Sequence, residues 1–301
     1  MVHHTLGERA AGPRHLLMAT ASFEEALFHW DRTRLPDLWA RAQMNLANST
    51  VALALREAGN DRLDRAIAAY RETLRVRTRE AGPGEWARTQ MNLAGALRHL
   101  AEATGEVAHL ETALSILDEA LCVRTRAADP HEWAITVLNR AMANRAFGAL
   151  TGKTARTEAA LADLDRAEAV FEAAEATYYL GCAALERGQG LSALASLVPD
   201  HAEARLTEAM AALGRAVTRF GSAGSRVDML VAQGHLALAR LQQGGIAGDR
   251  AQEDAARRDL ATASAALVET GHHRGAMMLE ARARTGPGAA PGSLPLRDAG
   301  T

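Results

Sequence analysis

Apolar residues recur every three or four positions along most of the chain, which is the spacing of one buried face of an α-helix. One such set would share a helix face: Leu63, Ala66, Ile67, Tyr70 and Leu74. A set in the same register follows at 110–121. Aromatic residues make up only 4 % of the chain and runs of β-branched residues are scarce, so strands have little from which to form. The pattern predicts an all-α protein.

The hydrophobic pattern repeats along the chain. Trp39, Trp86 and Trp133 are spaced by 47 residues, and the segments 38–47 and 85–94 agree at eight of ten positions. Self-similarity at a fixed period of this size is typical of stacked helical modules. Pro- and Gly-rich joints precede the second and third tryptophans, and proline suits the first turn of a helix. We therefore expect units of two helices, with the first helix of each unit beginning at such a joint.

These units resemble tetratricopeptide repeats (TPR). The first-helix signal of that family, Leu followed by Ala or Gly, is matched at Leu46-Ala47, Leu93-Ala94 and Leu180-Gly181. The second-helix signal, Ala-x3-aromatic, is matched or nearly matched at Ala66/Tyr70, Ala113/Leu117 and Ala167/Phe171. The period is 47 residues instead of about 34, as in the longer repeats of the kinesin light chain type and of many bacterial proteins. The resemblance implies a right-handed superhelix, an α-solenoid of about five to six helix-turn-helix pairs.

The strength of the repeat pattern divides the chain into four parts. We expect a partly disordered N-terminal segment at 1–21 and regular TPR repeats at 22–175. Divergent TPR-like repeats, with their first helix at 176–188 and a capping helix at their end, would occupy 176–284. The segment 285–301 lacks a helical period and is expected to be a disordered tail.

Charge and hydropathy exclude some partners. The formal net charge is −2, so no overall field attracts the chain to nucleic acid or to an anionic membrane. No window of 18 continuous apolar residues would span a bilayer, and the N-terminal apolar stretch is too short for a signal peptide. Cys122 and Cys182 lie in apolar, helix-like surroundings, where we expect buried free thiols in a reducing compartment. The expected location is therefore the cytoplasm.

The segment FGALTGKT at 147–154 resembles a phosphate-binding loop. The full pattern requires glycine five positions before Gly152, where this chain has Phe147, and it requires a preceding strand where this chain predicts a helix. We interpret the segment as the turn between the two helices of a unit. Its glycine would end the first helix, and Thr154 or Thr157 would cap the second.

No other motif predicts catalysis or cofactor binding. The eleven histidines include the adjacent pairs His3-His4 and His272-His273, whose side chains would point to different sides of a helix. No HExxH motif or other His, Cys or carboxylate cluster has metal-ligand spacing. We expect histidines that are solvated or lie at helix ends. The sequence predicts no enzyme, no catalytic residue, no metal and no cofactor.

A polar face on the first helices is the candidate binding surface. Its residues recur on one side of successive units: Arg41, Asn45, Asn48, Arg88, Asn92 and Asn139. In the TPR family, first helices line a concave groove, and asparagines at matching positions bind a peptide backbone or carboxylates. This resemblance implies that the six residues contact a partner. Alternatively, Asn45, Asn92 and Asn139 bridge neighbouring repeats.

The expected function is a non-catalytic scaffold or adaptor that binds a protein or peptide partner in the concave TPR groove. One alternative is a regulatory module that closes on a small molecule or signal peptide. Another is an enzyme or enzyme accessory protein, which would need a closed pocket of convergent titratable residues, expected within 176–284. The three tryptophans at the 47-residue period are expected to pack between units instead of binding a partner. Partner identity and oligomeric state stay open.

Overall fold

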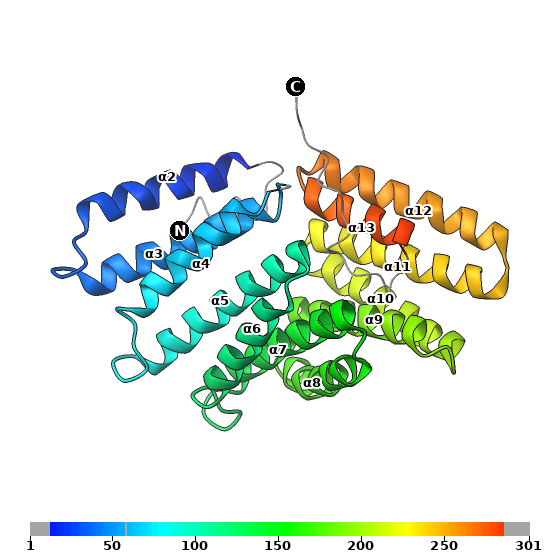
Figure 1. Ribbon diagram of the computed structural model, residues 1–301, viewed down its shortest axis with the longest axis horizontal. Coiled ribbons are helices and arrows are strands. Elements are labelled where there is room, and N and C mark those ends of the chain that lie inside the picture. Colours follow the sequence, from blue (N-terminus) through cyan, green and yellow to red (C-terminus); the bar gives the residue numbers. More distant parts are fainter. Residues whose placement is uncertain (1–12, 58, 286–301) are drawn as a thin grey trace.

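The computed structural model describes residues 13–57 and 59–285. Within these residues the protein has twelve α-helices and no β-strand, which confirms the predicted all-α class (Figure 1). The helices are α2 (Arg14–His29), α3 (Pro36–Ala54), α4 (Asp61–Leu74), α5 (Pro83–Thr104), α6 (Val107–Leu121), α7 (Pro130–Thr151), α8 (Thr154–Ala173), α9 (Thr177–Leu197), α10 (Ala202–Ser222), α11 (Arg226–Ala247), α12 (Arg250–Glu269) and α13 (His273–Thr285).

Some expectations fall partly outside the described residues. The expected tail at 285–301 lies outside them apart from Thr285, which is the last residue of α13. Residues 1–12 of the expected N-terminal segment also lie outside, whereas residues 14–21 belong to α2. The first helix of the divergent part does not end at 188 as expected, because α9 continues to Leu197.

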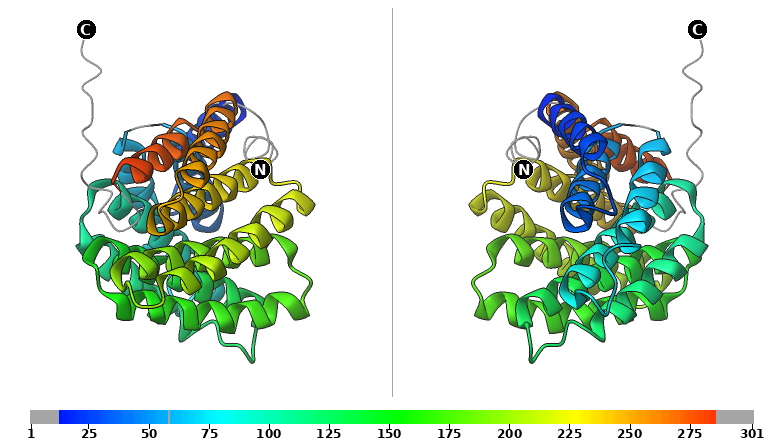
Figure 2. Two further views of the ribbon diagram at one scale, coloured as in Figure 1. Left: turned by 90° about the vertical axis from the view of Figure 1, so that its right-hand side faces the viewer. Right: turned by 90° about the vertical axis from the view of Figure 1, so that its left-hand side faces the viewer.

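The helices form a curved row. Each helix packs mainly against the next one in sequence, and α3, α5, α7, α9, α11 and α13 also contact one another in succession. The row bends so that its two ends approach each other, as Figures 1 and 2 show. At the closing point, Arg274 of α13 donates hydrogen bonds to the carbonyl oxygens of Ala54 and Gly59, both at 3.3 Å, and to Asn60 Oδ1 at 3.2 Å.

The hydrophobic core is a series of clusters along this row. One cluster joins helices α3 to α7, a second joins α7 to α9, and a third joins α11 to α13. A smaller cluster around Phe220 connects α9, α10 and α11. Burial therefore depends on contact between successive helices, since a single helix pair leaves part of its apolar face uncovered.

The 47-residue period of the sequence recurs in the structure. The helices α3, α5 and α7 begin at Pro36, Pro83 and Pro130. Proline has no backbone N–H, but no helical hydrogen bond is lost, because the N–H groups of the first turn have no acceptor within the helix. Fully buried leucines occupy one equivalent position of the second helices: Leu16 in α2, Leu63 in α4 and Leu110 in α6. The helix α2 therefore has the register of the second helices α4 and α6.

The segment 147–154 forms the turn between α7 and α8. Gly152 ends α7 in the left-handed conformation with φ of 70°, as expected for a glycine at this position. The predicted threonine cap is wrong, because Lys153 precedes the first turn of α8 and makes no side-chain capping bond. Thr157 instead packs close to Gly148, where a Cβ atom would lie 2.2 Å from its Oγ1. The threonine serves helix packing in this turn.

The expectation for the two cysteines was wrong for one of them. Both are free thiols, but Cys122, which follows the last residue of α6, is exposed, whereas its neighbours Ala120 and Val123 pack against Trp86. Cys182 lies in α9 and is partly buried.

Candidate functional site

An open groove of about 810 Å³, which we call the inner groove, is lined by the N-terminal parts of the inner helices α3, α5, α7 and α9 and by the C-terminal half of α2. Helices α2, α3, α5, α7 and α9 all contribute side chains to it. It contains five of the six residues predicted from the sequence: Arg41, Asn45, Asn48, Arg88 and Asn92. The sixth, Asn139, lines an adjoining hollow of about 400 Å³ that shares Asn48 and Asn92 with the groove. The six residues thus lie along one continuous surface.

Two of the asparagines connect neighbouring units. Asn48 Oδ1 accepts hydrogen bonds from the Tyr70 hydroxyl at 2.6 Å and from Asn92 Nδ2 at 3.1 Å, which links α3, α4 and α5. Asn139 Nδ2 instead donates to the carbonyl oxygen of Ile135 in its own helix, at 2.8 Å. Asn45 is only 8 % exposed. Of the three asparagines in the bridging alternative, Asn92 bonds to a neighbouring unit, through Asn48, whereas Asn139 makes a bond within α7.

The arginines of the groove keep donors for a ligand. Arg41 is exposed. Arg88 donates through Nη2 to Glu85, which also pairs with Arg77 Nη1 at 2.8 Å. The Nε atom of Arg88 is buried and has no hydrogen-bond partner among the described residues. A guanidinium group with unused donors is suited to a carboxylate.

The remaining lining of the inner groove is apolar or aromatic. Phe23 of α2 and Trp30, which follows α2, line it together with Met91, Ile135 and Tyr179. These side chains offer apolar surface next to the polar face. The groove can therefore hold a ligand that has both polar and apolar groups.

A second site lies at the other ends of the same helices. A cavity of about 220 Å³, which we call the central cavity, is lined by side chains of α5, α7, α9, α11 and α13. Arg145 Nη2 donates to Glu102 at 3.0 Å, and Arg145 Nε donates to Glu186. Arg98 Nη1 donates to the second oxygen of Glu102 at 2.7 Å. Between 5 % and 8 % of each of these four residues is exposed, so they form a buried ion-pair network across α5, α7 and α9.

Sequence reasoning missed this network, although part of its signal was present. Arg98 and Arg145 are 47 residues apart and so occupy equivalent positions of two units. Their acidic partners do not share a register, because Glu102 lies in one repeat and Glu186 lies in the divergent part. A periodicity search therefore finds the arginines but not the pairing.

Two histidines of the central cavity contradict the expectation of solvated or helix-end positions. His99 lies inside α5 and His235 inside α11. Burial, together with the charge of Arg98, lowers the pKa of His99 to about 3, and burial also lowers the pKa of His235. Curvature of the helix row places them here, since it turns these helix faces toward α13.

The carboxylate of Glu102 is held in its charged form. Burial by itself raises the pKa of Glu102, but Arg98 and Arg145 outweigh it and lower the pKa to about 2. A general base works best with a pKa near the operating pH, which neither Glu102 nor His99 has. The titratable side chains of this pocket run from Arg98 to Arg282, so they are not confined to 176–284, where the enzyme alternative expected its pocket. Its groups are better arranged for binding than for proton transfer.

No group of three His, Cys, Asp or Glu side chains within residues 13–57 and 59–285 is placed to hold a metal ion. Over the same part of the chain, no helix combines the length and apolar character needed to span a bilayer. Comparison of the sequence with models of known protein families and with curated proteins gives no match. The site's geometry is therefore the basis for a functional proposal.

Proposed function

We propose that this chain is a TPR-like α-solenoid, a right-handed superhelix of helix-turn-helix units, that acts as a non-catalytic scaffold for a protein or peptide partner. The observation that carries this proposal is the inner groove of about 810 Å³ with its row of polar side chains. Two successive units contribute equivalent groups 47 residues apart, Arg41 with Arg88 and Asn45 with Asn92, which suits the repeating backbone of an extended chain.

The chemistry of the groove favours a peptide with acidic and apolar side chains. Asparagine both donates and accepts hydrogen bonds, as a peptide backbone requires. Arg41 and Arg88 offer guanidinium donors for a carboxylate, and Phe23 and Trp30 offer surface for an apolar side chain. Asn48 and Asn92 support the groove through their mutual bond, so they act on binding partly by holding α3 against α5.

Selection of a phage-displayed library of random 12-residue peptides on the full chain tests this proposal. We expect enriched peptides that carry acidic and apolar residues and bind with one-to-one stoichiometry. Replacing both Arg41 and Arg88 by alanine should weaken binding of these peptides at least about tenfold, since charge-assisted hydrogen bonds are lost. Isothermal titration calorimetry measures the affinity, and circular dichroism checks that helicity is unchanged.

The matched control is Arg71→Ala, because Arg71 is exposed on the second helix α4 and does not line the groove. This variant should bind the selected peptides like the unmodified chain. If the selected peptides bind the double variant as tightly as the unmodified chain, binding takes place elsewhere. The same holds if Arg71→Ala lowers their affinity as much as the double substitution does. A selection that enriches no peptide would also contradict the proposal.

A further inference from the structure

The central cavity contains more positive than negative charge. Four arginines and two glutamates line it, which leaves an excess of two positive charges: Arg98, Arg145, Arg274, Arg282, Glu102 and Glu186. The two histidines add no charge at neutral pH, because the pKa of each is lowered. Unpaired charges in partly buried surroundings are costly, and a bound anion would offset that cost.

The excess charge belongs to α13. Arg98 and Arg145 are paired with the glutamates, whereas Arg274 and Arg282 form no ion pair with a carboxylate in the described part of the chain. Arg282 donates to the amide oxygen of Gln189 at 3.1 Å, and the hydrogen bonds of Arg274 go to backbone carbonyls and an asparagine. All of these acceptors are neutral.

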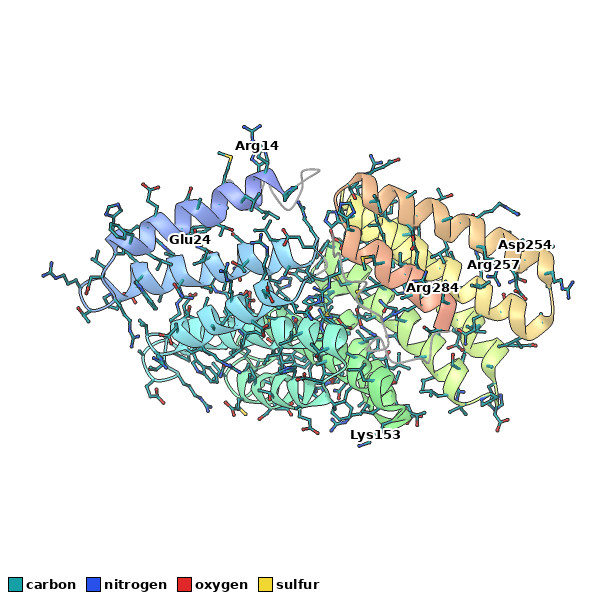
Figure 3. The ribbon with its side chains drawn as sticks, turned by 45° about the horizontal axis from the view of Figure 1, so that its top comes forward. Arg14, Glu24, Lys153, Asp254, Arg257 and Arg284 are labelled. Atoms are coloured by element: carbon teal, nitrogen blue, oxygen red, sulfur yellow. The ribbon has the colours of Figure 1, made fainter. Side chains whose placement is uncertain are left out.

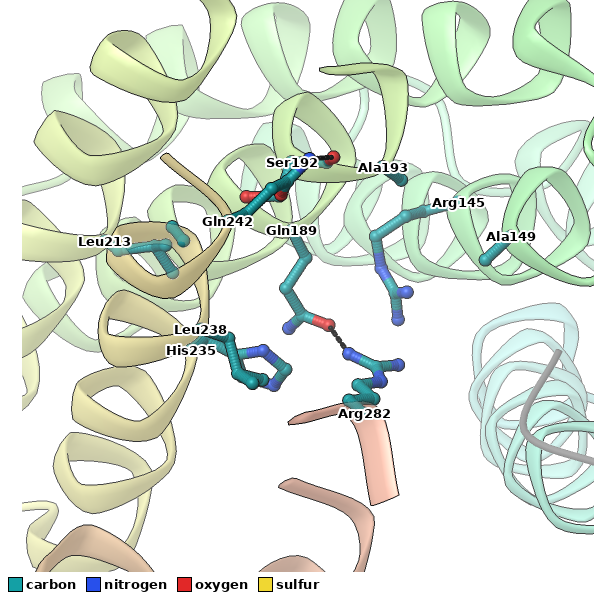
Figure 4. A pocket seen from close by; sticks show the side chains of 11 residues that line it. Arg145, Ala149, Gln189, Ser192, Ala193, Leu213, His235, Leu238, Gln242 and Arg282 are labelled. Carbon is teal, nitrogen blue, oxygen red and sulfur yellow. Dashed lines mark hydrogen bonds between the residues drawn. The ribbon is translucent and has the colours of Figure 1, made fainter. Parts of the chain in front are cut away.

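Two guanidinium groups converge on one space. Figure 4 shows Arg145 and Arg282 directed toward each other, with His235 and Gln189 beside them. Burial and the nearby charge of Arg145 lower the pKa of Arg282, which reflects this like-charge contact. An anionic group between them would meet N–H donors from both sides.

Part of the cavity wall is apolar. It is formed by Leu55, Met142, Leu185, Val231 and Met278. Water occupies about 30 Å³ per molecule in the liquid, so a cavity of about 220 Å³ has room for a small organic molecule. We infer that the central cavity binds a small organic acid, with its carboxylate between Arg145 and Arg282 and its hydrocarbon part against the apolar wall.

Such a ligand would also strengthen the closure of the helix row. The carboxylate would join α13 to α7, and α13 already holds the turn between α3 and α4 through Arg274. In α5, α7 and α9 this site uses residues that lie beyond those of the inner groove, and it adds residues of α11 and α13 that the groove does not contain. The inference therefore does not depend on the proposed peptide partner.

Binding of hexanoate by the full chain tests the inference, with hexylammonium and inorganic phosphate as comparison probes at equal ionic strength. At tenfold excess over its dissociation constant, we expect hexanoate to raise Tm by about 3 °C. Calorimetry should give one site per chain. Hexylammonium should not bind, because its charge is reversed, and phosphate should bind more weakly because it lacks a hydrocarbon part.

Arg282→Met retains much of the apolar volume of the side chain and removes its charge, so hexanoate affinity should fall at least about tenfold. The matched control is Arg284→Met, because Arg284 is exposed on the same helix (Figure 3). This substitution should leave the affinity for hexanoate unchanged. Arg282→Gln provides a second variant if the methionine variant does not fold. The groove variant Arg41→Ala should bind hexanoate normally, which separates this site from the peptide site.

Three results would overturn the inference. Equal binding of hexylammonium would exclude a role for the arginine charges, and undiminished binding by both Arg282 variants would place the ligand elsewhere. Phosphate binding as strong as that of hexanoate would contradict the assignment to an organic acid.

Discussion

The regular part of the chain, α2 to α8, and the divergent part, α9 to α13, are held together by different means. In the regular part the same polar contacts recur at 47-residue intervals. Arg77 Nη1 lies 3.1 Å from Met44 Sδ, and Arg124 Nη1 lies 3.7 Å from Met91 Sδ. An arginine also covers the tryptophan ring of each unit. Specific side-chain contacts thus define the register of the units.

Close approach of helices at glycines is more frequent in the divergent part, whereas the regular part has it at Gly148. Glycines in α9 and α11 sit directly beneath large side chains of neighbouring helices. A Cβ atom on Gly181 would lie 2.9 Å from the Phe220 ring, and one on Gly234 would lie 2.3 Å from Leu279 Cδ1. Helices of one array can therefore be held in register either by repeated polar contacts or by steric fit.

The largest change in the free energy of unfolding is expected from a substitution where the two parts meet. Arg145 of α7 connects Glu102 in the regular part to Glu186 in the divergent part. Replacing Arg145 by methionine leaves Glu186 buried without its ion-pair partner. Loss of one member of a buried pair costs about 3–5 kcal/mol, and we expect the free energy of unfolding to fall by that amount in urea denaturation.

Arg140→Met is the matched control for this substitution. Arg140 lies on the same helix and binds Asp118 and Asp163, but it is more exposed than Arg145. Its loss should cost less, about 1–2 kcal/mol, because the buried Asp163 keeps Arg166 as a partner and Asp118 is exposed to solvent. If both substitutions lowered the free energy of unfolding equally, the ion pairs of Arg145 would not be the main link between the two parts.

A smaller effect should distinguish steric fit from open packing. In Gly188→Ala, the new methyl group would lie 2.4 Å from Leu213 Cγ and 3.0 Å from the Ala209 carbonyl oxygen. We expect a loss of about 2 kcal/mol in the free energy of unfolding, because α9 and α10 must move apart. Chemical denaturation followed by circular dichroism measures this loss.

Gly95→Ala in α5 is the counterpart in the regular part. Nothing lies within 4 Å of a Cβ atom built at Gly95, so alanine should stabilise the helix by about 0.5–1 kcal/mol. The change in the free energy of unfolding should therefore have opposite signs for Gly188→Ala and Gly95→Ala. A gain in both variants would show that the close packing of α9 on α10 relaxes at no cost.

The sequence predicted the regular units because their markers are local. Pro83 and Pro130 fall where the first helices begin, and the tryptophans mark the same units. The helix α2 was predicted only in part, because residues 14–21 were assigned to the N-terminal segment although Gly12 and Pro13 precede the helix. Its signal was nevertheless present, because Leu16 and Ala19 stand 47 residues before Leu63 and Ala66.

The two sites differ in how far the sequence predicts them. Placement of Arg41 and Asn45 on one surface follows from spacing within one helix, which is local information. The central cavity depends on the curvature that brings Arg282 of α13 beside Arg145 of α7. Curvature accumulates from small rotations between many helix pairs, and no pattern in a single segment encodes it.

The smallest effect concerns the arginines that cover the tryptophans. Arg32, Arg79 and Arg126 lie 5.6–5.7 Å from the ring centres of Trp39, Trp86 and Trp133, and Arg166 also lies over Trp133. Exposed cation–π contacts contribute about 0.5–1 kcal/mol, so Arg32→Met and Arg79→Met should each cost about that much. The loss from Arg126→Met should be smaller, because a second cation remains.

Tryptophan fluorescence during urea denaturation measures these losses in the regular part, because the four tryptophans of the chain all precede residue 134. The double variant Arg32→Met with Arg79→Met should lose the sum of the single effects, since the two contacts belong to separate units. A markedly larger loss in the double variant would mean that the contacts are coupled through the row. The regular part would then resemble the divergent part, in which packing and not repeated contacts sets the register.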